Sequence, residues 1–134
     1  MFQRAYVEIT NVCNLRCSFC PGTAREKKFL DPAEFRVLAE KLRPWTDYLY
    51  LHVMGEPLLH PSLGEILDEC DRLGFRVCVT TNGVLLDDEV TEFCNREMHN
   101  VVLSLDGRKE VHDRFRKDYT GRGSYDTIVP NFQR

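Results

Sequence analysis

Residues 48–80, YLYLHVMGEPLLHPSLGEILDECDRLGFRVCVT, carry the pattern that decides the fold. The stretch opens with a nearly continuous apolar run, which is typical of a strand covered on both faces. Ser62 and Glu65 then have the spacing of a helical capping box, and Gly74 is a natural end for that helix. The last residues of the stretch predict another strand. This strand–helix–strand order predicts a parallel sheet with a right-handed crossover.

Another strand and helix are predicted upstream of this unit. Residues 5–10 form the strand, and a turn-rich loop follows from Asn11 to about Leu30. The helix then begins with Asp31 as its N-cap and Pro32 in its first position. Its apolar side chains recur with helical spacing and predict a buried stripe: Phe35, Leu38, Ala39 and Leu42.

The alternation continues downstream of the central unit. Asp87 is the expected N-cap of a helix, which precedes a strand at residues 100–105. A shorter helix is expected at about residues 109–117. Ser124 can start one more helix, which we expect Pro130 to interrupt after about one turn.

Four strand–helix units in this order predict an α/β fold. A closed eight-stranded barrel takes about 250 residues, whereas this chain has 134. We therefore expect one domain, residues 1–134, with the architecture of a partial (β/α) barrel. It consists of a parallel sheet of about four strands with helices on its outer face. The loops after the strands meet at the carboxyl edge of the sheet, where such folds hold their sites.

Composition and charge exclude several classes of protein. The chain is 43% hydrophobic and has a formal net charge of −3, and it contains no apolar run of the ~18 residues that a membrane span needs. Residues 1–4 lack a secretory signal, so we expect a cytoplasmic protein with no membrane or nucleic-acid partner. Residues 108–134 form a basic C-terminal segment with seven basic and four acidic side chains. We interpret this segment as a solvated face in preference to a phosphate or RNA contact.

Three of the six cysteines lie within eight residues, directly after the first predicted strand. Cys13, Cys17 and Cys20 have the spacing C-x3-C-x2-C, which points to metal binding in a reducing compartment. Structural zinc takes four protein ligands, whereas three thiolates on an iron–sulfur cubane leave one iron open to a small molecule. We favour the cluster. The alternatives are three ordinary thiols or a zinc site that His52 or His60 completes.

The remaining cysteines fall on apolar helical stripes or alternate within a strand. They are interpreted as small buried side chains: Cys70, Cys78 and Cys94. His60, if it is not a ligand, is expected to lie exposed before the start of a helix.

Residues 7–20, VEITNVCNLRCSFC, resemble the opening of the radical S-adenosylmethionine (SAM) enzymes. The resemblance implies that the loop at residues 11–22 holds a 4Fe–4S cluster through its three cysteines. It also implies that the fourth iron chelates the amino and carboxylate groups of SAM. Reductive cleavage of SAM then gives a 5′-deoxyadenosyl radical, which abstracts hydrogen from the substrate. Phe19 lies beside the adenine by resemblance, or packs the loop, and no catalytic side chain beyond the cluster is implied.

The segment Met54-Gly55-Glu56-Pro57 resembles the Gly-Gly-Glu-Pro motif that binds the SAM amino group in this family, with Met54 in place of the first glycine. Gly55 permits a close approach of the backbone to a ligand, and Pro57 favours an extended conformation at Glu56. Backbone carbonyls and the Glu56 carboxylate are then available to a cationic amine. On its own, however, Gly-Glu-Pro is a common turn.

Two further motifs follow the third and fourth predicted strands. Residues 80–83, TTNG, and residues 104–107, SLDG, both resemble segments of the family that contact SAM. Asn-Gly is also a good turn former, so the first motif can equally cap its strand. Four residues are implied as cofactor contacts: Thr80, Asn82, Ser104 and Asp106. Residues 112–126 resemble peptide-modifying and maturase-like members, in which either Arg114 or Arg116 can pair with a carboxylate.

The resemblance covers about residues 5–126, whereas family cores have about six strand–helix units. The sequence thus corresponds to the N-terminal part of such a core, and its fourth strand has an open edge. A truncated gene is our favoured explanation; a partner chain or self-association that covers the edge are the others. The favoured function is a radical SAM enzyme with flavodoxin or ferredoxin as electron donor and a peptide, protein or small metabolite as substrate. The alternative is a catalytically incomplete cluster- or zinc-binding remnant that serves in binding or assembly.

Overall fold

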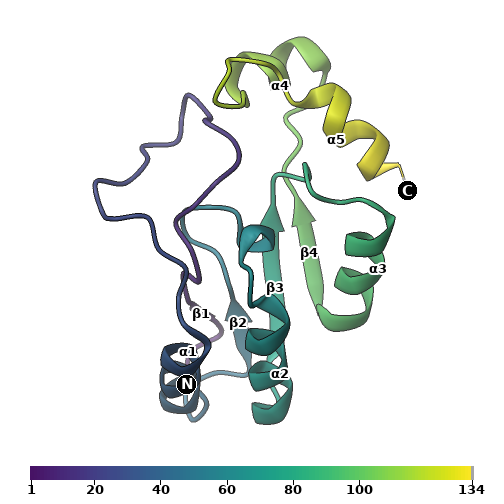
Figure 1. Cartoon of the computed structure of the whole chain (residues 1–134). Helices are drawn as coiled ribbons and strands as arrows, with labels where there is room; N and C mark the ends of the chain where they lie inside the picture. The colour runs from purple at the N-terminus through teal and green to yellow at the C-terminus, as the bar shows by residue number, and fades with distance from the viewer. Residues whose placement is uncertain (134) are drawn as a thin grey trace.

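The computed structural model describes residues 1–133 and contains a parallel sheet in the order β1–β2–β3–β4 (Figure 1). The strands are β1 (Ala5–Tyr6), β2 (Tyr48–Tyr50), β3 (Arg76–Thr81) and β4 (Asn100–Leu103). The helices are α1 (Pro32–Leu42), α2 (Leu63–Leu73), α3 (Asp88–Glu97), α4 (Lys109–Phe115) and α5 (Tyr125–Phe132), with a short 3-10 turn, η1 (Pro57–Leu59). The predicted α/β class and four-stranded parallel sheet are confirmed.

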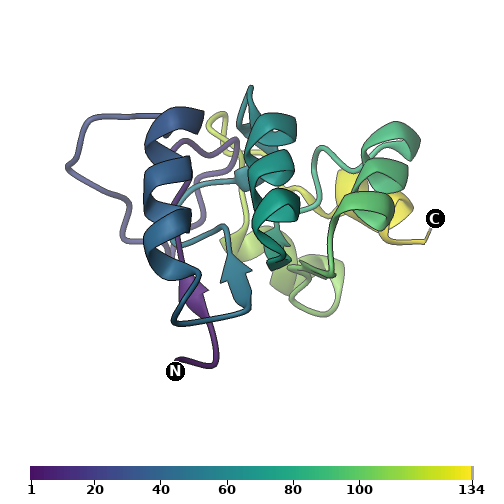
Figure 2. The same cartoon turned by 90° about the horizontal axis from the view of Figure 1, so that it is seen from below.

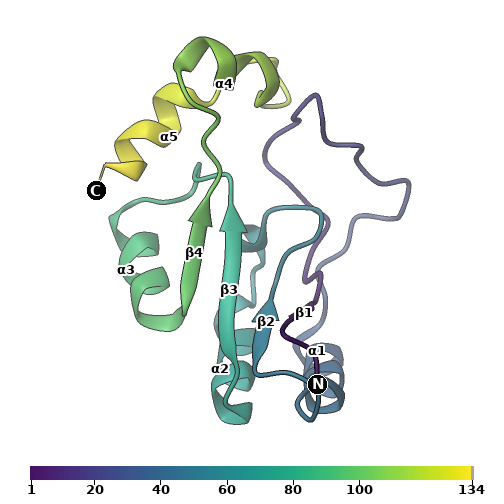
Figure 3. The ribbon, with the colours of Figure 1, turned by 180° about the vertical axis from the view of Figure 1, so that it is seen from behind.

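Helices cover one face of the sheet. α1, α2 and α3 lie side by side over it when the molecule is seen from below (Figure 2). The opposite face carries no helix of the described chain (Figure 3). α4 and α5 lie beyond the carboxyl ends of the strands, at the same end as the long loop between β1 and α1 (Figure 1). This is the open, one-sided arrangement of a partial barrel.

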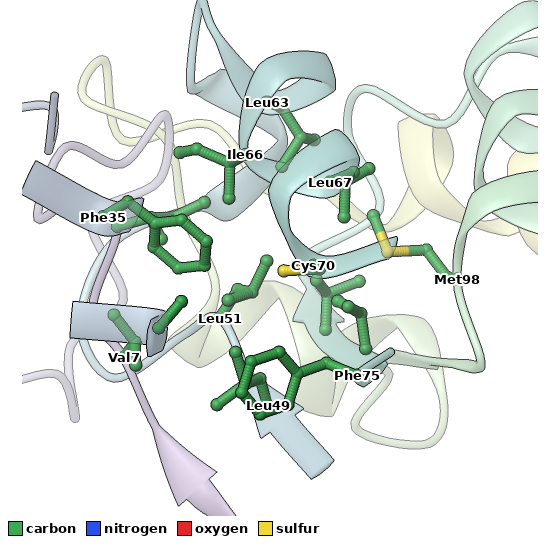
Figure 4. Close-up of a cluster of buried hydrophobic side chains, with 14 of the residues drawn as sticks. Val7, Phe35, Leu49, Leu51, Leu63, Ile66, Leu67, Cys70, Phe75 and Met98 are labelled. Atoms are coloured by element: carbon green, nitrogen blue, oxygen red, sulfur yellow. The ribbon is translucent and has the colours of Figure 1, made fainter. Parts of the chain in front are cut away.

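The hydrophobic core fills the space between the sheet and its helices (Figure 4). Phe35 of α1 and Ile66 of α2 are fully buried there, as are Leu49 of β2 and Leu51 just after it. Full burial of one such side chain contributes about 1.5–3 kcal/mol, so this layer supplies most of the drive to fold. Cys70, Cys78 and Cys94 are also buried, as predicted.

The helix ends follow the predicted capping signals except at α2. The Asp31 and Asp87 side chains each accept a backbone hydrogen bond at the start of a helix, and Gly74 ends α2 with a φ of 75°. The capping box predicted at Ser62 is wrong, because its side chain makes no capping hydrogen bond. The Ser62 backbone N–H instead donates to Nδ1 of His60, at 3.0 Å.

Three strands are shorter than predicted, and after β1 and β2 other groups form the hydrogen bonds in place of the ladder. After β1 the chain turns towards its own returning loop, where Thr10 forms an antiparallel bridge with Phe29. After β2, Nδ1 of the His52 side chain accepts the Thr80 N–H at 3.1 Å, where a backbone carbonyl would continue the ladder. β4 ends at Leu103.

Two helical predictions fail for local reasons. Leu38 is 42% exposed instead of buried, because α1 lies at the end of the row of helices and has a neighbour on one side only (Figure 2). Pro130 lies inside α5 without interrupting it. The proline removes one N–H donor, but hydrogen bonds of Ile128 and Gln133 on either side persist, and Ile128 is fully buried.

None of the helices within residues 1–133 combines the length and apolar character that crossing a membrane requires.

Candidate functional site

The loop at residues 11–22, called the cysteine loop below, and the carboxyl ends of the strands enclose a pocket of about 870 Å³. Most of the predicted site residues line it: Cys13, Cys17, Phe19, Cys20, Gly55, Glu56, Thr80, Asn82 and Ser104. Two of them do not line it. Pro57 is buried at the start of η1, and Asp106 forms an ion pair with Arg116, which does line the pocket. The structure therefore brings together residues from four separate segments.

All three cysteines of the loop are free thiols. Cys13 and Cys17 are half-buried and Cys20 is exposed, with a turn between them in which the Cys20 N–H donates to the Cys17 carbonyl at 3.1 Å. Burial raises the pKa of both Cys13 and Cys17 above the ordinary thiol value. Burial therefore favours the protonated form of these two thiols.

The donor set fits a cluster better than a single ion. Among residues 1–133, no three His, Cys, Asp or Glu side chains are arranged to hold one metal ion. A closed zinc site needs four ligands around one point, whereas each thiolate of a cubane binds a different iron. Three cysteines that share a pocket without meeting at one point therefore suit a cluster.

The two histidines considered as zinc ligands both use ring nitrogens for hydrogen bonds within the fold. His60 was expected to be exposed, and this is wrong: it is buried, with Nε2 2.8 Å from the Leu30 carbonyl oxygen and Nδ1 accepting from Ser62. It thus ties the end of the long loop to the start of α2. His52 lines the pocket, and its Nδ1 is used by β3. Burial lowers the pKa of His52.

Gly55 packs directly against the chain that enters the cysteine loop. Its φ is 80°, and a Cβ atom there would lie 2.6 Å from the Thr10 carbonyl oxygen and 2.8 Å from that of Val12. The neighbouring Glu56 N–H donates to the same Val12 carbonyl at 2.8 Å. A residue without a side chain is needed at this position, because backbone atoms occupy the space.

The Glu56 carboxylate joins the exits of β2 and β3. It is only 2% exposed and accepts hydrogen bonds from the Thr81 hydroxyl at 2.8 Å, the Asn82 N–H at 2.9 Å and the Leu58 N–H at 3.1 Å. Burial raises its pKa, although these three donors act in the opposite direction. A carboxylate has about four acceptor sites, so most of the capacity of this group is used inside the protein.

Asn82 connects the end of β3 to the cysteine loop. Its Nδ2 donates to Oδ1 of Asn14 at 2.7 Å and lies 3.7 Å from the Cys13 sulfur. Its Oδ1 accepts the Val84 N–H at 3.1 Å. The side chain is therefore held at both ends and fixes the position of the first cysteine.

Of the two arginines considered as partners of a carboxylate, Arg116 pairs with Asp106 of the protein itself and lines the pocket. Its guanidinium donates to Asp106 at 2.7 Å and stacks over the Phe19 ring, 4.9 Å from the centroid. The same cation opposes the effect of burial on the pKa of Cys17. Arg114 instead stacks on the adjacent Phe115.

The backbone after α4 runs beside the cysteine loop, which the sequence did not predict. The Arg16 N–H donates to the Lys117 carbonyl at 2.6 Å, and the Ser18 N–H donates to the Phe115 carbonyl at 2.9 Å. Part of the basic segment at residues 108–134 is thus a support for the loop as well as a solvated face. Neither stretch has strand periodicity, so no pattern indicated that they pair.

Comparison with known proteins gives a consistent result. The family model of the Radical SAM superfamily matches residues 7–134. A GTP 3',8-cyclase of Clostridium perfringens is 29% identical over 136 residues, covering 96% of this chain and 41% of that protein. This chain therefore spans about two-fifths of the length of that relative.

Solved structures share the fold. The structure of anSMEcpe with bound AdoMet has a TM-score of 0.83 at 19% identity and covers 98% of this chain and 39% of that one. Streptococcus suis SuiB bound to the precursor peptide SuiA has a TM-score of 0.75 at 20% identity, covering 96% and 29% of the two chains. The match of the family model over nearly the whole sequence establishes that this chain belongs to the radical SAM superfamily, a family of enzymes that use a 4Fe–4S cluster and SAM.

Proposed function

We propose that this chain is the cofactor-binding part of a radical SAM enzyme that abstracts hydrogen from its substrate. Cys13, Cys17 and Cys20 hold a 4Fe–4S cluster, and SAM occupies the same pocket. One observation carries this proposal: three thiols of one loop line a single pocket with residues from the ends of β2, β3 and β4. When bound, the cluster supplies the electron that cleaves SAM to methionine and a 5′-deoxyadenosyl radical.

The thiols determine how metal loading depends on pH. Thiolates, not thiols, ligate iron, so each cysteine must lose a proton when metal binds. Burial raises the pKa of Cys13 and Cys17, and the Arg116 cation partly offsets this at Cys17. Loading therefore improves as the pH rises, and Arg116 eases it at Cys17.

The walls of the pocket supply the contacts for SAM. Phe19 is 57% exposed at the pocket and offers an aromatic face to the adenine. For the ammonium group, the remaining acceptor site of the Glu56 carboxylate and the backbone carbonyls of residues 54 and 55 are the proposed acceptors. Thr80 and Ser104 offer hydroxyl groups to the ribose or carboxylate from the neighbouring strands. Asn82 and Asp106 act mainly by holding Cys13 and Arg116 in place.

For the substrate we favour a peptide. SuiB, which shares the fold, has a precursor peptide bound in its solved structure, and residues 112–126 resemble peptide-modifying members. A protein or small metabolite is the other substrate class, and flavodoxin or ferredoxin is the proposed electron donor.

Anaerobic reconstitution with iron and sulfide tests this proposal. We expect about four iron and four sulfide per chain, as a cubane requires. With dithionite and SAM, the loaded protein should release 5′-deoxyadenosine. Cys17→Ala should abolish this release, whereas Cys94→Ala should preserve it because Cys94 is buried on α3 outside the pocket.

Two outcomes would contradict the proposal. Stoichiometric zinc binding without iron uptake would favour a zinc-binding remnant. A chain that takes up the cluster but releases no 5′-deoxyadenosine would favour a cluster-holding binding module.

A further inference from the structure

His112 is a fully buried titratable side chain that the proposed chemistry does not use. It lies on α4 with 0% exposure. Its Nδ1 accepts the backbone N–H of Asp106 at 3.3 Å, and its Nε2 lies 2.9 Å from the Ser124 hydroxyl oxygen. That hydroxyl donates to the Arg116 carbonyl at 2.8 Å. Every polar atom of this chain of contacts therefore has a partner.

The partners determine which ring nitrogen carries the proton. The Asp106 N–H can only donate, so Nδ1 of His112 must be unprotonated. The single hydroxyl hydrogen of Ser124 goes to the Arg116 carbonyl, so the serine oxygen can only accept from Nε2. The ring is thus neutral, with its proton on Nε2.

The His112 ring connects the backbones of Asp106 and Arg116, and the side chains of these two residues are also joined. The Arg116 guanidinium donates to both carboxylate oxygens of Asp106, at 2.7 and 3.4 Å. The backbone contacts through His112 and Ser124 and the ion pair between Asp106 and Arg116 thus form a closed loop. The Arg116 guanidinium also stacks on the Phe19 ring and lines the pocket.

Burial of the ring is the main influence that favours this neutral state. Burial and the Arg116 cation lower the pKa of His112, whereas Asp106 and Asp113 act in the opposite direction. From α5, the Tyr125 ring packs edge-on against it at 5.8 Å. A second proton would have to enter at Nδ1, which faces the Asp106 N–H, so ionisation would break that contact.

We propose that His112 is a positioning residue: its neutral ring, with the proton on Nε2, holds Arg116 against Phe19 and beside Cys17. The aromatic face and the cation at the pocket are then fixed before any ligand arrives, which reduces the ordering that binding must produce. The positioning follows from the contacts alone, and its consequence for SAM rests on the proposed function.

The proton position is measured by NMR of the full chain with isotope-labelled histidine, near neutral pH and without metal. We expect unprotonated Nδ1 and protonated Nε2 at His112. A protonated Nδ1, alone or in a charged ring, would overturn the proposal. This measurement requires no variant.

Two variants test the positioning itself, with Arg43 as an internal control. His112→Gln replaces the ring by an amide, and Ser124→Ala removes the hydroxyl that links Nε2 of His112 to the Arg116 carbonyl. The readout is solvent exchange of the arginine Nε–H groups. Loss of one hydrogen bond should speed exchange at Arg116 roughly five- to tenfold, whereas Arg43, whose Nε–H donates to the Leu73 carbonyl at 2.6 Å, should be unaffected. Equal acceleration at both arginines would show general destabilisation and overturn the proposal.

The consequence for the site is measured on the reconstituted protein. In both variants we expect a raised KM for SAM in cleavage, with unchanged iron per chain. His99→Gln, at an exposed position, is the control with unchanged KM. An unaltered KM in variants that release Arg116 would overturn the link to SAM. The NMR measurements need neither iron nor SAM. Their result therefore tests the positioning role of His112 even if the proposed function fails.

Discussion

The helix-covered face of the sheet and its carboxyl edge are built from different side chains. Beneath the helices, Phe35, Leu49 and Ile66 are fully buried and apolar (Figure 4). At the carboxyl edge several buried side chains are polar or charged, and Glu56 and His112 each have hydrogen-bond partners for their polar atoms. The first region is held by apolar burial, which is non-directional, and the second by contacts that require defined geometry.

The difference separates stability from function. A change in the apolar layer should lower the free energy of unfolding and leave the pocket of the folded protein intact. A change at the edge should displace the cysteine loop even where the loss of stability is smaller. Three predictions test this separation, in order of decreasing effect.

Phe35→Ala should have the largest effect on stability, about 3–5 kcal/mol, because it leaves a cavity in the core. Leu38→Ala on the same helix should change the free energy of unfolding by less than about 1 kcal/mol, since Leu38 is 42% exposed. Urea unfolding measures both. Below its unfolding temperature, the Phe35 variant should still take up iron normally. Loss of iron uptake in the folded variant would show that the apolar layer also determines the state of the site.

Gly55→Ala should come next and should act on the site. The substitution combines a φ of 80° with backbone atoms 2.6 Å from the new Cβ, so we expect a loss of about 3 kcal/mol and reduced iron per chain. Gly121→Ala is the matched control, because its φ is 84° but its surroundings are open. It should lose about 1–2 kcal/mol and keep its iron. Equal losses of stability and iron in the two variants would show that the close approach at Gly55 is unimportant.

The smallest effect concerns pH and His112. Its pKa is lowered from the ordinary value of 6.5, so the unfolded chain takes up this proton at a higher pH than the folded chain. The contribution to stability is complete above pH 6.5 and is lost as the pH falls through the lowered pKa. His112→Asn removes the titrating group, so its free energy of unfolding should depend less on pH over this interval. The same pH dependence in both proteins would contradict the prediction.

The sequence predicted those features of the fold that depend on local chemistry. Asp31, Gly74 and Asp87 mark helix ends through backbone capping, which needs only neighbouring residues. The cysteine loop was correctly expected at the carboxyl edge, because a parallel topology leaves few places for a loop after the first strand. Strand ends were predicted less well, since they depend on side chains such as His52 that replace backbone acceptors.

The sequence predicted which residues line the site better than it predicted the contacts that these residues make. Nine predicted residues line one pocket, but the sequence could not show that Glu56 is largely occupied by internal hydrogen bonds. Nor could it show that Arg116 lies over Phe19, almost a hundred positions away along the chain. Such contacts depend on tertiary packing between segments without periodic patterns. A buried histidine with two polar partners also leaves no local signal.

Mössbauer spectroscopy of the anaerobically loaded protein, with and without SAM, tests the three-cysteine cluster most directly. Three protein thiolates leave one iron of a cubane without a protein ligand. Addition of SAM should therefore change about one quarter of the iron absorption and leave the remainder unaltered. A spectrum that SAM does not change, or one that shows isolated iron ions in place of a cluster, would contradict the account.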